Sequence, residues 1–343
     1  MKAVHTYVPT REGFEFSREI AHNMLLSVLY AQIHYEGVEL YTNKENAKLV
    51  KEIGIPYDKI ITDVFDNFDV RTFSVPKILT YSVQNEEYVH LDLDTFVVSK
   101  IDCPGNVKFF YAHPDIDMRS VGDFQYGINM YETYLKNTYE IKDKIPDEIK
   151  KHIDFNDIPN MNVFGVRDFE SVEKASKFCL EFYQENKEFF DSDFYNACII
   201  EQLLMPAAIK HFHGEFYKNH YLIEPKDVFR IEHGTKDHRN VTYPVEIFFD
   251  GERLLIDNEE FLYQFVKYDY RTIVHLGGFK NLDVIQFLVK ETIIERFNAL
   301  DKIKKINRMF KDKTSAEEIS DRYYVHLLNS VSNRIREMRS SLI

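Results

Sequence analysis

The sequence predicts an α/β protein with a mostly parallel, mixed sheet flanked by helices, followed by a helical extension at the C-terminal end. Over roughly the first hundred residues, short β-rich runs alternate with helical patterns, which is typical of parallel strands joined by crossover helices. The chain has 343 residues, 44% of them hydrophobic, so it can bury a large core. From Leu282 onward the apolar spacing is helical, with a break around residues 311–314.

The first two expected strands enclose a long helix. Residues 2–8 are the first strand. After a turn signal, apolar residues recur at helical spacing over residues 17–34, and the Ser17 side chain can cap this helix. Gly37 ends the helix, and residues 38–41 are the second expected strand.

Another helix, a third strand and a third helix follow. Residues 46–53 predict a helix that Gly54 stops, and residues 59–64 predict a short strand. Residues 72–84 have helical spacing again, with Pro76 in the first turns. This order is typical of the opening of a nucleotide-binding α/β domain.

The middle of the chain contains the most β-like run of the sequence, residues 87–99. Farther on, residues 161–166 predict a strand. Residues 169–190 and 194–210 predict helices, the second with an interruption at Pro206. These elements continue the α/β arrangement.

Two stretches are less regular. Residues 131–156 are rich in Lys, Asp, Glu and Tyr and have few core-forming residues, so we expect an insertion or a mobile, partly helical excursion there. Residues 219–250 predict strands and turns. We therefore expect one domain over residues 1–285, followed by a helical extension of residues 286–343.

Composition excludes several classes of protein. The apolar runs are far shorter than the roughly 18 to 20 residues that cross a bilayer, and the sequence starts without a secretion signal, so we expect no membrane span and a cytoplasmic protein. Three widely separated cysteines, Cys103, Cys179 and Cys198, suit reduced, buried thiols. The net charge of −13 disfavours a protein that mainly neutralises nucleic-acid phosphates.

The strongest chemical signal is a pair of aspartates in the most β-like run. Asp92 and Asp94 are two positions apart, so in a strand their carboxylates would point to the same side at its carboxyl end, the edge where open α/β sheets bind ligands. Two close carboxylates are costly unless a cation lies between them, and oxygen ligands select Mg²⁺ or Mn²⁺. The pair therefore predicts a site for a metal ion and a diphosphate; the alternative is a solvated strand end.

Two segments resemble a known family. Residues 89–98 resemble the Asp-x-Asp segment of nucleotide-sugar glycosyltransferases of the GT-A fold, especially the retaining family 8 group that includes glycogenin and bacterial lipooligosaccharide galactosyltransferases. That group has a late His-x-x-Gly-x-x-Lys signature, to which residues 275–280 are similar. The match departs from the signature because Lys280 comes one residue early and no Pro-Trp follows.

The resemblance implies a metal and diphosphate site. It makes His275 the third metal ligand beside Asp92 and Asp94, and it places Gly278 and Lys280 at the donor diphosphate. An imidazole there would complete a metal site, and glycine would let the backbone approach phosphate. The alternative for His275 is a capped surface histidine.

The resemblance also implies a donor-sugar site. Asn160 lies in a segment similar to the family's run beside the donor sugar, although Asn162 replaces the expected glycine. Glu201 and Gln202 resemble a pair in which the acid holds sugar hydroxyls and the amide lies near the anomeric carbon. Lys77, or alternatively Arg71, corresponds to a basic residue that reaches the donor. The alternatives are a turn residue, solvated helix positions and a surface charge.

The end of the first strand is where uridine lies in this fold, so the resemblance implies that His5, Thr6 and Tyr7 contact the base. The aspartate pair together with the resemblance predicts a metal-dependent glycosyltransferase that uses Mn²⁺ or Mg²⁺ and an unidentified acceptor hydroxyl. The resemblance alone implies that it moves a hexose, with retention, from a UDP-sugar. The alternatives are a non-catalytic nucleotide-sugar-binding module, a glycosyltransferase acting on a modified nucleic-acid base, and a haloacid-dehalogenase-like phosphatase. Against the phosphatase, Phe96 stands where that loop has Thr or Val.

The extension combines a long apolar stripe with a basic charge. Helices are expected over residues 284–310 and 315–338. Residues 301–343 have a net charge of +4, against −17 for residues 1–300, which fits a solvated helical face or a docking surface. Because the stripe is longer than one helix needs, we expect the part after Leu300 to contact a second subunit, making a homo-oligomer, or the acceptor. The alternative is that the two helices pair with each other against the domain.

Overall fold

The computed structural model describes residues 1–10, 15–66, 71–97, 101, 107–111, 136–155, 158–159, 161–192, 194–213, 228–232, 245–249, 252–256, 273–275, 286, 289–290, 292–294 and 296–310.

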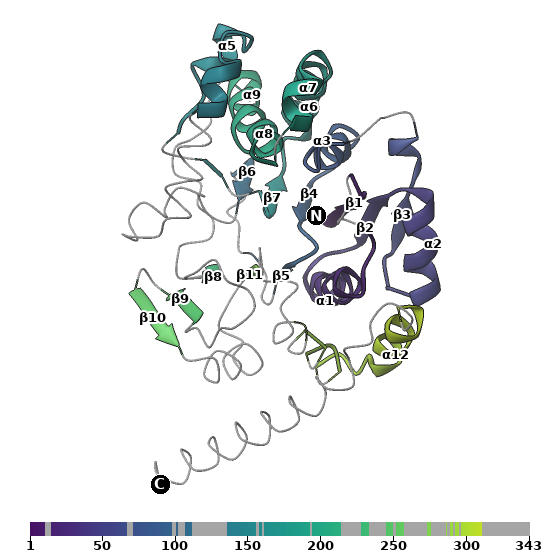
Figure 1. Cartoon of the computed structure of the whole chain (residues 1–343). Helices are drawn as coiled ribbons and strands as arrows, with labels where there is room; N and C mark the ends of the chain where they lie inside the picture. Colours follow the sequence, from purple (N-terminus) through teal and green to yellow (C-terminus); the bar gives the residue numbers. More distant parts are fainter. Residues whose placement is uncertain are drawn as a thin grey trace.

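A six-stranded sheet forms the centre of the described structure (Figure 1). Its strands are β1 (Lys2–Tyr7), β2 (Val38–Thr42), β3 (Lys59–Ile61), β4 (Tyr88–Leu91), β6 (Phe109–Tyr111) and β7 (Val163–Val166). They lie in the order β3-β2-β1-β4-β7-β6. The neighbours from β3 to β4 are parallel, while β7 runs antiparallel to β4 and β6. The predicted mostly parallel, mixed sheet is confirmed.

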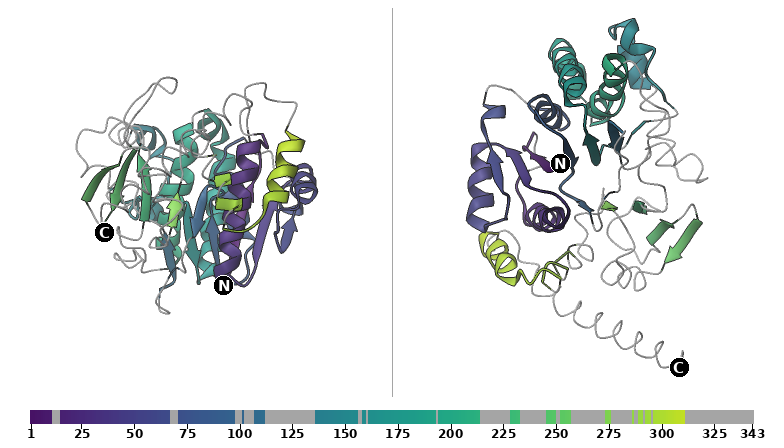
Figure 2. Two further views of the ribbon diagram at one scale, coloured as in Figure 1. Left: turned by 90° about the horizontal axis from the view of Figure 1, so that it is seen from below. Right: turned by 180° about the vertical axis from the view of Figure 1, so that it is seen from behind.

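Helices cover both faces of this sheet (Figures 1 and 2). Side chains alternate along a strand, so Ala3 belongs to one buried cluster and Val4 to the other. The first cluster includes α1 (Arg18–His34), α2 (Lys44–Ile53) and α12 (Leu300–Met309). The second includes α3 (Val75–Ser82), α6 (Phe169–Glu185), α7 (Lys187–Ser192), α8 (Phe194–Cys198) and α9 (Met205–His213).

The strand order reverses direction between β1 and β4. The chain moves outward from β1 to β3 and returns to the other side of β1 as β4, by way of the short helix η1 (Asp63–Phe65) and α3. Such a reversal leaves a crevice at the carboxyl ends of the two central strands. Tyr7 ends β1 and Asp92 follows β4, so both lie at this crevice.

A second sheet continues from the first. It consists of β5 (Thr95–Val97), β8 (Val228–Glu232), β9 (Val245–Phe249), β10 (Glu252–Ile256) and β11 (Ile273–His275), in the order β10-β9-β8-β11-β5. The β-like run over residues 87–99 is divided into two strands of different sheets, β4 and β5, so the expectation that Asp92 and Asp94 lie on one strand is wrong. The chain turns at residues 92–94, where the Thr95 N–H donates to the Asp92 carbonyl at 3.0 Å.

The helix expected over residues 194–210 continues past its proline. A π-helical segment, η3 (Ile199–Leu204), lies between α8 and α9. Pro206 lacks the N–H that would bond to the Gln202 carbonyl in an α-helix, and its ring would clash with that carbonyl. A wider π turn just before the proline relieves this conflict without ending the helix.

The stretch expected to be a loose insertion contributes to the core. Ile141, Ile145 and Ile149 are at most 2% exposed and belong to the same cluster as α9. The short helix α5 (Asp147–Lys150) contacts α9, and Asn137 donates to Asn196 at 2.5 Å. The isoleucines are spaced four apart, a signal that the high charge of the stretch obscures.

The apolar stripe of the extension packs within the chain. Ile303, Ile306 and Phe310 are buried against α1 and α2. The apolar face of α12 is therefore covered by α1 and α2 of the same chain, so its stripe is no reason to expect a contact with a second subunit or the acceptor. The expected helix 284–310 is also divided, since Asn298 adopts a left-handed φ of 51° just before α12. Residues 311–343, with the second expected helix, lie outside the described residues.

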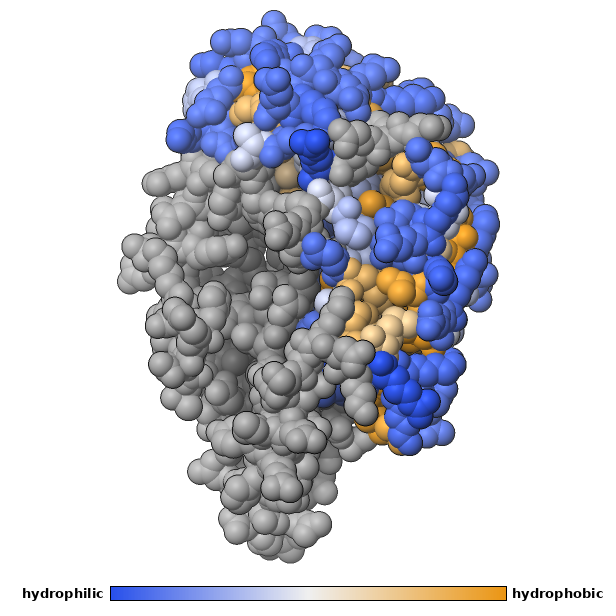
Figure 3. Space-filling view, turned by 45° about the vertical axis from the view of Figure 1, so that its right-hand side comes forward, coloured by the Kyte–Doolittle hydropathy of each residue, from blue (hydrophilic) through white to orange (hydrophobic). Residues whose placement is uncertain are grey.

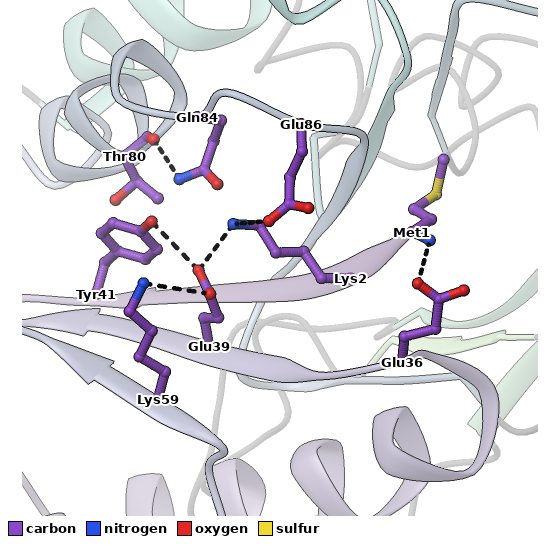
Figure 4. A network of polar contacts seen from close by, with 9 residues as sticks. All are labelled: Met1, Lys2, Glu36, Glu39, Tyr41, Lys59, Thr80, Gln84 and Glu86. Carbon is purple, nitrogen blue, oxygen red and sulfur yellow. Dashed lines mark hydrogen bonds and ion pairs between the residues drawn. The ribbon is translucent and has the colours of Figure 1, made fainter.

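A separate ion-pair network joins the amino ends of the strands (Figure 4). Lys2 Nζ lies 2.9 Å from Glu39 Oε2 and 3.0 Å from Glu86 Oε1, and Tyr41 donates to Glu39 at 3.3 Å. Burial opposes the charge of Lys2, but hydrogen bonds to the two glutamates outweigh it and raise the lysine pKa. This network lies at the opposite edge of the sheet from the crevice.

Among the described residues, no helix is both long enough and apolar enough to span a membrane. On the face shown in Figure 3, the described helices present mostly hydrophilic residues, with apolar residues grouped near the middle.

Candidate functional site

The turn that carries the two aspartates is fixed by backbone hydrogen bonds. The Asp92 N–H donates to the Asn162 carbonyl at 2.8 Å, and the Asp92 carbonyl accepts from Thr95. The reason for expecting the two carboxylates together was their position on one strand; the structure replaces that strand with a turn between two sheets. Asp94 is 6% exposed, whereas Asp92 is partly exposed.

Lys77 brings three of the predicted residues together. Its Nζ lies 2.7 Å from Asp92 Oδ1 and 3.1 Å from Glu201 Oε1. The side chains of Lys77 and Glu201 are 15% and 3% exposed. Burial alone would lower the lysine pKa, but the two carboxylates outweigh it and raise that pKa, so the ammonium stays charged. A buried cation held by acids from two distant elements therefore lies at the crevice.

The π-helical segment supplies the second acid. Glu201 lies in η3, and the wider turn there fixes which way each of its residues faces. Gln202, the neighbouring predicted residue, is partly exposed. π-helical turns occur frequently at functional sites, so the segment is a candidate part of the site.

The backbone register places the third predicted metal ligand near the aspartates. In the antiparallel pair formed by β5 and β11, His275 lies opposite Thr95, which directly follows Asp94. Directly opposed residues of antiparallel strands have Cα atoms about 5 Å apart. No group of three or more His, Cys, Asp or Glu side chains that could hold a metal occurs among the described side chains, which do not include that of His275.

The donor set of this region fits a hard divalent ion. Two carboxylates lie in one turn, and a histidine backbone lies beside that turn. Carboxylate oxygens with an imidazole suit Mn²⁺ or Mg²⁺ better than softer metals. Asp92 would exchange part of its contact with Lys77 for the metal.

A chain of buried polar groups lies behind Lys77, and the sequence analysis missed it. The Tyr81 hydroxyl contacts His90 Nδ1 at 3.4 Å, and His90 Nε2 contacts Thr6 Oγ1 at 3.1 Å. Thr6 in turn donates to Thr80 at 2.9 Å. Burial, with Lys77 nearby, holds the pKa of His90 well below its usual range, so it is neutral. The signal available in the sequence was a histidine within an otherwise apolar strand.

The three residues expected to contact a base have protein partners. His5 is 0% exposed, and its ring contacts Tyr57 and Ser27. Thr6 belongs to the chain just described, and Tyr7 is 8% exposed and packs edge-on against Phe16. A base contact by His5 would have to break one of its two hydrogen bonds.

The remaining predicted residues are Asn160, Gly278 and Lys280, which lie outside the described residues. Asn162, the departure from the family pattern, is 2% exposed, and its carbonyl holds the aspartate turn. Another aspartate that occurs in an Asp-x-Asp pair, Asp191, lies 2.6 Å from Lys187 and accepts from Tyr183 at 2.9 Å. Asp191 therefore ties helices together.

An open, mostly parallel sheet with an ionic cluster at its point of strand reversal defines an α/β protein of the Rossmann-like class. The chain belongs to the family of unknown function DUF6734, whose sequence profile matches residues 5–243. No curated protein matches the chain.

The structure is similar to several solved glycosyltransferases. The galactosyltransferase LgtC, in complex with donor and acceptor sugar analogues, is 12% identical, with a TM-score of 0.32 over 59% of this chain and 71% of that one. Mouse xyloside xylosyltransferase 1 is 13% identical, with a TM-score of 0.30 over 58% and 81%. The bifunctional glycosyltransferase WbbM is 11% identical, with a TM-score of 0.39 over 89% of this chain and 51% of that one. Similarities of this size identify no donor, acceptor or mechanism.

Proposed function

We propose that this protein is a metal-dependent glycosyltransferase that moves a hexose from a UDP-sugar to an acceptor hydroxyl with retention. The observation that carries the proposal is Lys77, a buried ammonium between Asp92 and Glu201 at the crevice of the central strands. Burying such a cluster is costly for stability, which favours a functional reason for it. Anionic, phosphate-bearing ligands bind at this position in open α/β sheets.

Each residue of the cluster has a role suited to its chemistry. Lys77 would offer its ammonium to the donor diphosphate, and Glu201 would accept hydrogen bonds from sugar hydroxyls. Gln202 would place its amide near the anomeric carbon. Asp92, Asp94 and His275 would hold Mn²⁺ or Mg²⁺, which supplies compensation for charge on the departing nucleotide.

The first test is donor binding and turnover. We expect UDP to bind more tightly in the presence of Mn²⁺ by isothermal titration calorimetry, and a UDP-hexose to be hydrolysed slowly without an acceptor. Asp94→Ala should abolish both effects while leaving the far-ultraviolet circular dichroism unchanged. Asp143→Ala, which removes an exposed carboxylate far from the turn in the sequence, is the matched control and should behave as wild type. Full activity of Asp94→Ala at low metal would overturn the proposed site.

Stereochemistry provides a separate test. Proton NMR of the first product formed should show the anomeric configuration of the donor. An inverted product would eliminate the retaining mechanism while leaving the transferase assignment in place.

A second function is favoured by one observation: Lys77 already neutralises part of the charge on Asp92, as it would in a site that binds a nucleotide sugar without turning it over. Tight UDP-sugar binding with no hydrolysis or transfer would identify such a non-catalytic module.

A further inference from the structure

A serine from the long helix α1 contacts the aspartate turn from the inside of the protein. Ser27 is 0% exposed, and its Oγ donates to the Thr95 carbonyl at 2.7 Å. Thr95 directly follows Asp94 and lies opposite His275 in the second sheet. Ser27 therefore holds Thr95, the residue that is next to one proposed metal ligand in the chain and opposite another in the sheet.

The hydrogens of this contact can be assigned from chemistry. A carbonyl oxygen only accepts, so Ser27 uses its single hydrogen on Thr95. Ser27 Oγ must then accept from His5 Nε2, 3.2 Å away, which places the proton of His5 on Nε2. His5 Nδ1 is left to accept from the Tyr57 hydroxyl at 2.7 Å. Each group therefore donates to the next one: Tyr57 to His5, His5 to Ser27, and Ser27 to the Thr95 carbonyl.

The chain leaves the turn little freedom. His5 and Ser27 are both 0% exposed, so neither can replace a lost partner with bulk water. A shift of the turn would leave the hydroxyl hydrogen of the buried Ser27 without its acceptor, and burial makes such a lost hydrogen bond unfavourable. The chain also joins three elements, since His5 lies on β1, Ser27 on α1 and Thr95 on β5.

We propose that Ser27 and His5 are positioning residues that fix the Asp92–Asp94 turn in its metal-binding arrangement. They act through the Thr95 carbonyl, which Ser27 contacts directly and His5 reaches through Ser27. This inference rests on the proposed function for the metal, but the fixing of the turn is a property of the protein alone. The two parts can therefore be tested separately.

The test compares Ser27→Ala with Ser176→Ala. Ser176 is also 0% exposed and on a helix, but its hydroxyl faces Met205, in the other buried cluster. Amide hydrogen exchange of the metal-free proteins should be faster at residues 92–95 in Ser27→Ala than in wild type, and unchanged in Ser176→Ala. Titration with Mn²⁺ should show a dissociation constant raised by about tenfold, the lower end for residues that orient metal ligands.

A second variant keeps the test decisive if Ser27→Ala fails to fold. Tyr57→Phe removes one hydroxyl from a partly buried ring and leaves His5 in place, and it should loosen the same turn to a smaller degree. In wild type, the nitrogen NMR shifts of His5 should identify the neutral tautomer with the proton on Nε2. Equal exchange at residues 92–95 in Ser27→Ala, Tyr57→Phe and Ser176→Ala would overturn the inference. Absence of Mn²⁺ binding in wild type would instead remove the proposed metal site, and the exchange data would still decide whether the chain fixes the turn.

Discussion

Lys77 is a buried ammonium whose removal should lower the stability of the protein. Replacing it with methionine removes the ammonium that pairs with Asp92 and Glu201. Breaking a buried ion pair costs roughly 3–5 kcal/mol, and since Asp92 is 23% exposed we expect the lower end of that range. Urea unfolding should show this loss for Lys77→Met, and adding Glu201→Gln should restore part of it.

The control is a lysine in an exposed pair. Lys177 lies 2.6 Å from Glu173, with side-chain exposures of 63% and 40%. Surface pairs of this kind contribute about 0.5 kcal/mol or less. Lys177→Met should therefore leave the unfolding free energy nearly unchanged. Similar small losses in both variants would show that Lys77 is not held as the structure describes.

His22 gives the protein a predictable response to acid. It is 1% exposed, and burial lowers its pKa to about 4, despite a hydrogen bond to Gln286 that acts the other way. Because the folded pKa lies below the ordinary value of 6.5, the unfolded chain binds more protons in this window. The stability contribution is therefore complete above pH 6.5 and is lost as pH falls toward 4.

Replacing His22 should make the unfolding free energy depend less steeply on pH. One such group adds up to about 1.4 kcal/mol per pH unit to the pH dependence of the unfolding free energy. His22→Gln should flatten the acid limb by that amount, measured by urea unfolding at several pH values between 6.5 and 4. His5, whose pKa burial lowers to about 3, continues to act in the variant. An unchanged slope would contradict the buried, neutral state of His22.

Individual residues of the site could be predicted where chemistry limits the choice. Asp92 was predicted as a metal ligand from the spacing of the two aspartates, whereas Lys77 and Glu201 were expected only from the resemblance; the structure brings the three together. The contact between Lys77 and the two acids was not foreseen, because their sequence separation carries no information about which side chains meet. His5 shows the opposite case: its position at the end of the first strand suggested a base contact by resemblance, whereas its buried ring has protein partners.

The π-helical segment shows how one proline shapes an element. Pro206→Ala restores an N–H able to bond to the Gln202 carbonyl, so η3 can become regular α-helix. A residue in an α-helix is rotated by about 100° from its neighbour, so a change of register would turn Glu201 away from Lys77. We expect thermal stability equal to or above wild type, together with weaker UDP-sugar binding.

A second proline serves as the control for that change. Pro146 precedes the short helix α5, and its substitution by alanine leaves η3 untouched. Pro146→Ala should therefore retain wild-type donor binding in the same calorimetric assay. If Pro206→Ala also binds the donor normally, the π turn does not position Glu201.

Periodic elements were predictable and interruptions were not. Helix α1 begins after Ser17, whose side chain accepts from the Ile20 N–H as its position suggested, and α2 ends at Gly54 with a left-handed φ of 78°. The turn at residues 92–94 lies within a continuous β-like pattern, because residues on both sides of it are buried. Local propensity cannot distinguish one long strand from two short strands in different sheets.

Across the whole molecule, long-range pairing decides what local patterns cannot. His275 lies opposite Thr95 only because β11 joins β5 in the second sheet. No periodicity in either segment specifies this partner, whereas the resemblance to a metal-binding signature did point to it. The packing of α12 is a similar case. Its apolar stripe could be seen in the sequence, but the helices that it packs against, α1 and α2, could not.

The packing of α12 leads to a prediction about assembly. Ile306 is 0% exposed and Leu300 on the same helix is 42% exposed, so Ile306→Ala should cost about 2–5 kcal/mol, and Leu300→Ala far less. Because Ile306 packs on its own chain, the loss of unfolding free energy in Ile306→Ala should be the same at low and high protein concentration. Stability that depends on subunit association rises with concentration by mass action. Urea unfolding of wild type and both variants over a hundredfold range of concentration, roughly from 0.5 to 50 μM, separates these cases. A penalty for Ile306→Ala that changes with concentration would place this face between subunits, and the intramolecular packing would be wrong.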